Sequence, residues 1–212
     1  NNVGIGYLTA DAMTGANNNV AIGNGALGTM VHGDNNTAVG HDALATANEA
    51  GINRNTAFGH TAAALLTTGA SNTAIGSRAM GAGTVTGDNN TCVGEGAGSN
   101  ITDGADNVFI GTGAGGHDVN FTTGDHCVVI GSIADVSAAG AQNQNVLGYN
   151  VTSAGNDSFT FGSGTDDTTC TNGGTTWSAP SDIRLKEDIQ DEVVGMDFIN
   201  ELRPVTFRWK KA

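Results

Sequence analysis

The most regular feature of the chain is a five-residue alternation of polar and apolar positions that ends on glycine, as in NVAIG at 19–23 and NTAVG at 36–40. In each copy the second and fourth residues share one face of an extended strand, and the small third residue faces the other way. The pattern therefore predicts one short β-strand per copy. The other copies are NVGIG (2–6), NTAFG (55–59), NTAIG (72–76), NTCVG (90–94) and NVFIG (107–111), with looser versions at 127–131, 145–148 and 158–162.

These copies recur with a nearly fixed period. Their closing glycines are 14 to 20 residues apart, most often 17, and an alanine follows three positions after seven of them. The variation in length falls in turn-forming clusters such as GDNN at 33–36. A fixed period predicts a solenoid, in which each coil buries its apolar face only against its neighbours. We therefore expect an all-β fold, a parallel β-solenoid or β-roll with coils of about 17 residues, over residues 1–162.

Three further features of residues 1–162 agree with stacked coils. Asparagine opens most copies, and asparagines at the same place in successive coils are expected to form a ladder of side-chain amides. The closing glycine indicates a bend or a close approach of two backbones. Proline, which cannot donate a ladder hydrogen bond, does not occur before Pro180.

The small size of the alternating alanines bears on oligomeric state. A coil of this length contains only one or two large apolar side chains, and a face of Ala and Gly is too small to fill a wide core. We therefore expect three chains to share the core around a threefold axis. This expectation of a homotrimer follows from side-chain volume.

Charge divides the chain into two unlike parts. The whole chain has a formal net charge of -13, yet residues 1–180 contain only two cations, Arg54 and Arg78, against 14 acidic residues. So few cations argue against nucleic acid and anionic membranes as partners, and no apolar run approaches the ~20 residues that span a bilayer. Residues 181–212 contain six Lys and Arg against seven acidic residues.

The pentads, each followed by alanine, resemble the head repeats of trimeric autotransporter adhesins over roughly residues 1–135. The same left-handed parallel β-roll occurs in the shafts of some phage tail fibres. The resemblance implies a left-handed, homotrimeric shaft with an attachment role. A bacterial trimeric surface adhesin is one alternative, and a tailspike depolymerase is another.

After a junction at 163–180, residues 181–212 change to helical spacing, with apolar residues such as Ile189, Val193 and Phe198 three to six positions apart. Pro204 is expected to end the helix, and VTFRW at 205–209 alternates like a strand. This short α+β segment, from SDIRLK to LRPVTFRWK, resembles the start of the endosialidase-type C-terminal intramolecular chaperone of phage tail fibres and tailspikes. The resemblance implies a chaperone that drives trimerisation.

Many members of that family cleave themselves immediately before the serine of this motif, which here is the bond between Pro180 and Ser181. The residues offer a route for such a cut, with Ser181 as the nucleophile and a neutral Lys186 as the base, a known variant of hydroxyl-plus-base catalysis. The residues alone favour the simpler interpretation, in which Ser181 is the N-cap of the following helix and Lys186 is a solvated surface charge, and the resemblance brings cleavage level with it. Both interpretations stay open at this point.

Other candidate sites have structural interpretations. His41 and His60 both follow an aligned glycine and are expected to stack along the solenoid rather than to bind a metal. Trp177 is expected to pack at the end of the shaft, and the irregularly spaced Cys92, Cys127 and Cys170 are expected to be buried hydrophobes. The scattered carboxylates offer no assignable acid–base pair. We expect no cofactor and no metal.

Together these features predict the distal part of a homotrimeric phage tail fibre. Its expected partners are copies of itself, other tail-fibre or virion proteins, and a polysaccharide or protein receptor on the host cell surface. Its expected location is the virion, outside the cell. No substrate-directed enzyme is expected, apart from autoproteolysis at the Pro180–Ser181 bond.

Overall fold

The computed structural model describes residues 1–47, 52–164 and 167–176. This part of the chain forms eleven short strands and contains no helix, so the all-β prediction is confirmed. The strands are β1 (Val3–Ile5), β2 (Val20–Ile22), β3 (Thr37–Val39), β4 (Thr56–Phe58), β5 (Thr73–Ile75), β6 (Thr91–Val93), β7 (Val108–Ile110), β8 (Val128–Ile130), β9 (Gln144–Tyr149), β10 (Ser158–Ser163) and β11 (Thr168–Thr171).

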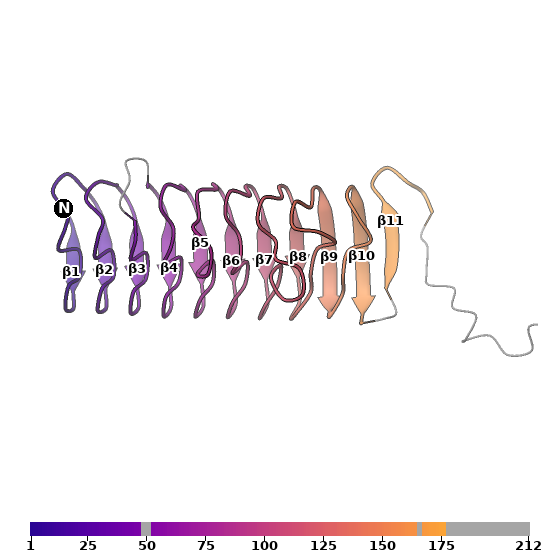
Figure 1. The fold of residues 1–212 in the computed structure, drawn as a ribbon, viewed down its shortest axis with the longest axis horizontal. Helices are drawn as coiled ribbons and strands as arrows, with labels where there is room; N and C mark the ends of the chain where they lie inside the picture. The colour runs from indigo at the N-terminus through magenta and orange to yellow at the C-terminus, as the bar shows by residue number, and fades with distance from the viewer. Residues whose placement is uncertain (48–51, 165–166, 177–212) are drawn as a thin grey trace, which may run out of the picture. The chain divides into compact units, whose positions relative to one another are not determined.

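The strands lie side by side in sequence order as one sheet (Figure 1). Neighbours from β1 to β10 are parallel, and the aligned pentads pair position by position, so that Thr56 of β4 lies opposite Thr37 and Thr73. The result is the expected β-solenoid, with about nine turns of ~17 residues. β11 reverses direction and pairs antiparallel with β10, which ends the parallel stack. Handedness and trimer formation stay predictions, and the α+β segment at 181–212 lies outside the described residues.

From β2 onward, the middle residue of each pentad points into the coil. Ala21, Ala38 and Ala57 are each 0% exposed, as are the larger Cys92 and Phe109 at the same position. The residues on either side of them are partly or largely exposed, so they face outward. The predicted alternation is therefore confirmed.

The interior is filled differently from the expectation. Five of the seven coils that carry the recurrent alanine place a large apolar side chain in the interior, either directly after that alanine or four residues after it. Leu27 and Met80 occupy the first position, and Met30 and Ile101 the second. These side chains fill the space opposite the strand alanines and exclude water within a single chain. One chain thus buries this core by itself, which the volume argument did not foresee because it counted only the strand residues. The packing of three chains around a threefold axis stays a prediction.

The recurrent asparagines form the expected ladder, which runs from Asn2 to Asn107. Asn36 illustrates a step: its backbone N–H and its Nδ2 donate to Oδ1 of Asn19, at 2.7 and 3.1 Å. Its Nδ2 also donates to the carbonyl oxygen of Ile52, at 3.0 Å. The asparagines from Asn19 onward are buried, so these bonds satisfy polar groups that would otherwise cost about 1–3 kcal/mol each.

The ladder ends where the sequence departs from asparagine. The backbone N–H of Cys127 donates to Oδ1 of Asn107 at 2.9 Å, but its thiol continues no amide row. In the next coil Gln144 is fully buried and bonds instead to Ser137 and Asn156. The ladder therefore spans the coils whose pentads open with Asn.

The closing glycines show both features expected from the sequence, a bend in the backbone and a close approach of two backbones. Gly59 has φ +140°, and a Cβ placed on it would lie 2.6 Å from the carbonyl oxygen of Gly76 in the next coil. Non-glycine residues in the described part of the chain also adopt positive φ, but only up to the 62° of Asn35. Glycine at the end of each pentad is therefore required by the backbone angle and by the contact between coils.

One coil uses a large residue where the others use alanine. Phe109 occupies the inward strand position and packs edge-to-face on Phe121, with ring centroids 5.0 Å apart. Its ring takes the space that Leu27 or Met80 fills elsewhere, because the matching position is Gly115. A Cβ on Gly115 would lie 2.6 Å from Cδ1 of Phe109. Large and small residues thus exchange positions within a coil of nearly constant interior volume.

Candidate functional site

The two predicted catalytic residues, Ser181 and Lys186, lie outside the described residues, as do Pro180 and Trp177. Their roles therefore stay predictions. The features described below belong to the solenoid.

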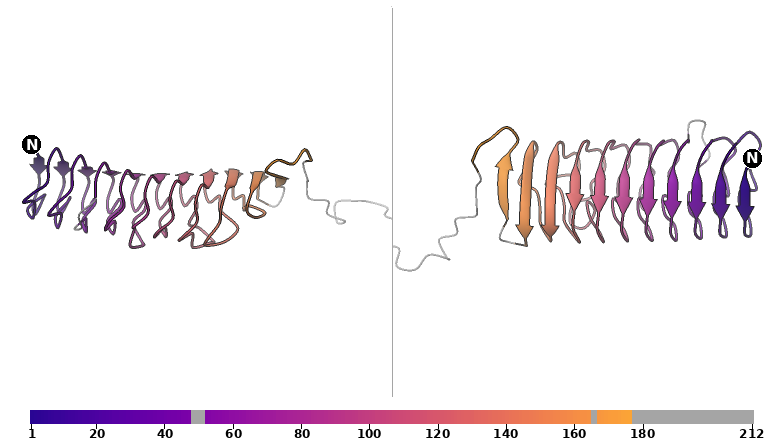
Figure 2. Two further views of the ribbon diagram at one scale, coloured as in Figure 1. Left: turned by 90° about the horizontal axis from the view of Figure 1, so that it is seen from above. Right: turned by 180° about the vertical axis from the view of Figure 1, so that it is seen from behind.

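The outer face of the sheet carries one continuous row of apolar side chains. The fourth residue of each pentad points outward, and the strand register places each directly beside the next. We call this row the outer column; it consists of Ile5, Ile22, Val39, Phe58, Ile75, Val93, Ile110, Ile130, Leu147 and Phe161. Eight of the ten are between 36% and 58% exposed, and no described segment covers this face (Figure 2). An apolar surface of this regularity is typical of an interaction site.

The charged residues lie away from this column. None of the eleven strands contains Asp, Glu, Lys or Arg. Several carboxylates in the turns are structural: Oδ1 of Asp34, Asp88 and Asp125 accepts a backbone N–H from the preceding coil at 2.7–2.8 Å. The acidity of residues 1–180 is thus partly a consequence of how the turns are bonded.

Asp135 is a buried carboxylate that the sequence analysis did not single out. Its Oδ2 accepts the backbone N–H groups of Asp118 and Val119, and its Oδ1 accepts that of Val136, all at 2.8 Å. Burial raises the pKa of Asp135 above its ordinary value, and the three hydrogen bonds offset only part of that effect. One signal was available: Asp135 follows the recurrent alanine, at the position where Leu27 and Met80 lie in other coils.

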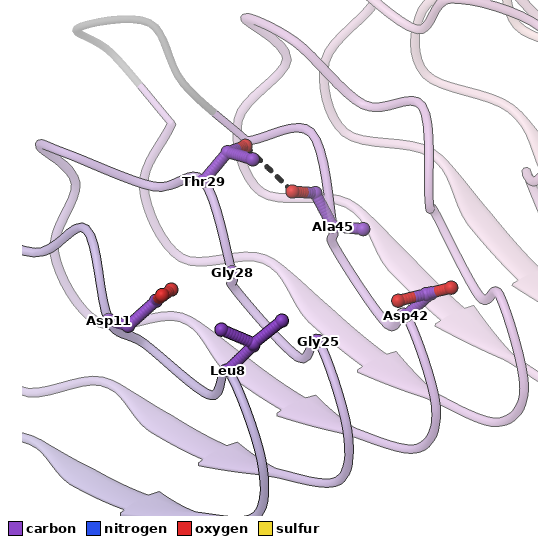
Figure 3. A pocket seen from close by; sticks show the side chains of 7 residues that line it. All are labelled: Leu8, Asp11, Gly25, Gly28, Thr29, Asp42 and Ala45. Carbon is purple, nitrogen blue, oxygen red and sulfur yellow. Dashed lines mark hydrogen bonds between the residues drawn. The ribbon is translucent and has the colours of Figure 1, made fainter.

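A shallow groove of about 310 Å³ crosses the turns of the first three coils (Figure 3). It forms where Gly25 and Gly28 leave room between Leu8 and Asp11 on one side and Asp42 on the other. Thr29, on its rim, is engaged, since its Oγ1 donates to the carbonyl oxygen of Ala45 at 2.7 Å. Asp42 lies 3.1 Å from Nδ1 of His41, which is half-exposed. The bond from Thr29 links two neighbouring coils, the contact of His41 with Asp42 lies within one turn, and neither assigns acid and base roles.

The expected histidine stack is confirmed. The rings of His41 and His60 have centroids 5.3 Å apart and planes inclined by 19°. Within the described residues, no group of three or more His, Cys, Asp or Glu side chains is arranged to hold a metal ion.

The three cysteines are free and buried, as expected. Burial raises the pKa of the Cys92 and Cys127 thiols. At neutral pH both are therefore protonated and poorly nucleophilic.

Comparison with known proteins gives one match. Residues 181–212 match the model of a family described as the chaperone of endosialidase. No curated protein and no solved structure matches the chain. Among the described residues there is no helix long and apolar enough to cross a membrane. The match agrees with the resemblance drawn from the SDIRLK and LRPVTFRWK motifs and concerns only this terminal part of the chain.

Proposed function

We propose that this chain is the distal part of a homotrimeric phage tail fibre, in which residues 1–162 form the shaft and residues 181–212 begin an intramolecular chaperone. The observation that carries the proposal is the succession of a repetitive parallel β-solenoid and a segment that matches the endosialidase chaperone family. The shaft is a structural and attachment element of the virion. Its exposed turns are the surfaces available to a host polysaccharide or protein receptor and to other virion proteins.

The repetitive fold supplies a physical reason for the chaperone. Successive coils pair almost identical pentads, so a shift by one repeat preserves the alternation of inward and outward side chains and costs little energy. Parallel pairing of strands is also slow, and its intermediates expose apolar edges that aggregate. A segment that brings three chains together first limits the shifts that their shafts can adopt.

We propose further that the chaperone segment cleaves itself from the shaft. Ser181 Oγ attacks the carbonyl carbon of Pro180, an ester forms, and the bond from that carbon to the Ser181 nitrogen breaks. Lys186, in its neutral form, accepts the hydroxyl proton, and the released amine takes a proton in turn. Water then hydrolyses the ester, which leaves the shaft with a carboxylate at Pro180.

The test is the intact mass of the natural full-length protein beside a Ser181→Ala variant. We expect the wild type to lose everything after Pro180 and the variant to remain whole. Ser178→Ala, three residues upstream, is the matched control and should cleave normally. An uncleaved wild type refutes the roles of Ser181 and Lys186.

The same samples test assembly separately. Native mass spectrometry should give three shafts per particle, with or without the segment. A monomeric shaft in both the cleaved and uncleaved forms refutes the trimeric fibre.

A further inference from the structure

The outer column is left over once the fold of a single chain is complete. The inward strand residues pack on side chains such as Leu27 and Met80, so the coil needs no outside help to exclude water from its core. The outward residues of the central strands remain accessible instead: Phe58 is 57% exposed and Ile75 39% exposed. We propose that the outer column is the surface through which copies of this chain pack against one another, in register, along the solenoid.

The extent of the column suits a lasting interface. Ten strands spaced about 4.8 Å apart give it a length of roughly 40 Å. Apolar residues on a protein surface are normally scattered singly, whereas these ten form one continuous row. A stable interface buries about 800 Å² per partner, so a copy is expected to cover the column together with the adjacent row of second pentad residues, such as Thr56 and Thr73.

The spacing of the column selects its partner. Its side chains repeat with the distance between parallel strands, and they do so ten times. A partner of different periodicity drops out of phase within a few coils and leaves side chains unmatched. A second copy of this chain has the same spacing and the same irregularities, so every layer of the column meets an equivalent layer.

Charge leads to the same partner. The chain has a net charge of -13, so two copies repel one another wherever their charged surfaces meet. The strands that carry the column contain no charged residue. The sheet is therefore a face on which identical acidic chains associate without bringing like charges together, and it offers nothing to attract a basic partner.

The number of copies, three, rests on the proposed function of a trimeric fibre. The choice of surface rests on the outer column alone. In an in-register assembly, equal positions of the column lie at the same level. Cysteine at a column position should therefore cross-link to its own equivalent. A shift by one coil separates the two thiols by about 4.8 Å along the stack and prevents a disulfide.

The experiment compares Ile75→Cys with Leu65→Cys in the natural full-length protein. Leu65 is the matched control, because it is 37% exposed but lies in a turn outside the column. On mild oxidation, we expect covalent dimers of shaft chains from Ile75→Cys and none from Leu65→Cys. Maleimide should label the thiol of Ile75→Cys at least tenfold more slowly than the thiol of Leu65→Cys. The natural cysteines are buried, and the unmodified protein reports their background.

The outcomes separate the two proposals. A trimer in which position 75 neither cross-links nor is protected overturns the assignment of the surface and leaves the trimeric fibre standing. A wild-type protein that sediments as a monomer overturns the fibre itself. If Ile75→Cys fails to assemble, Ile110→Cys, 38% exposed and two strands further along, provides the same test.

Discussion

Replacing Gly59 with alanine tests the most general feature of the solenoid, the glycine that closes each pentad. Gly59 lies immediately after β4, with φ +140°. An added Cβ would lie 2.6 Å from the carbonyl oxygen and 2.7 Å from the carbonyl carbon of Gly76. Both contacts are to the backbone of the next coil, so no side-chain rotation relieves them.

Two costs add in this variant. Backbone angles in a sparsely populated region cost on the order of 1–3 kcal/mol, and forcing an extra carbon into a packed region costs about 1–3 kcal/mol more. We expect Gly59→Ala to lower the free energy of unfolding by roughly 2–6 kcal/mol. Because the added Cβ pushes the coils of β4 and β5 apart, it should also weaken the hydrogen bond from the Gly76 N–H to the Phe58 carbonyl oxygen.

The matched control is Gly96→Ala. Gly96 also has positive φ, at +65°, but nothing lies within 4 Å of a Cβ there. Alanine in this left-handed conformation should cost only about 1–2 kcal/mol. Urea unfolding followed by far-UV circular dichroism, with all chains at equal concentration, measures both variants. If Gly59→Ala loses no more stability than Gly96→Ala, the contact between glycines is not what selects this residue.

Two further predictions concern the interior. Phe109→Ala should lower the free energy of unfolding by about 3–5 kcal/mol through the cavity it leaves. Adding Gly115→Leu to that variant should restore much of the loss, because the pair then matches the Ala and Leu of other coils. Gly115→Leu alone should destabilise the protein, because its side chain collides with the ring of Phe109. A double-mutant cycle of urea unfolding free energies measures this coupling, and additive effects would contradict the exchange of volumes. Burial raises the pKa of Asp135, so the folded state binds the carboxyl proton more tightly than the unfolded state does. The contribution of Asp135 to stability is therefore greatest below the ordinary carboxyl pKa of 3.8, and it falls as pH rises through the raised pKa. Asp135→Asn should abolish that part of the pH dependence and cost about 1–3 kcal/mol, because its amide nitrogen faces backbone donors; an unchanged dependence of unfolding free energy on pH would show that Asp135 is not the group responsible.

The period of the sequence was sufficient to predict the repeating parts of the fold. The Asn36 ladder and the Gly59 contact each require one residue type at one place in every coil, and such a requirement appears directly as a repeat. The interior residues Leu27 and Met80 were missed because their position accepts leucine, methionine, alanine, glycine and, once, aspartate. A position that is constrained by volume rather than by chemistry leaves no constant letter in the sequence.

The candidate site divides in the same way. The alternation showed that Ile75 and its equivalents share a face, and the structure confirmed it. Alternation alone does not tell which of the two faces of a strand the coil encloses. The small size of the strand alanines suggested a core shared between chains, not one closed within a single chain. Asp135 was not predicted because two of its three hydrogen-bond donors, Asp118 and Val119, come from the preceding coil at a distance of sixteen or seventeen residues.

By itself, therefore, the sequence determined the coil period, the strands, the asparagine ladder and the glycine contacts, because each is a local rule applied many times. Only the tertiary structure decided which apolar side chains a single chain buries and which it leaves outside. Closing a coil brings residues far apart in the pentad and the turn against one another, and the volume they fill together fixes how much of the chain remains exposed. The outer column is what that closure leaves uncovered.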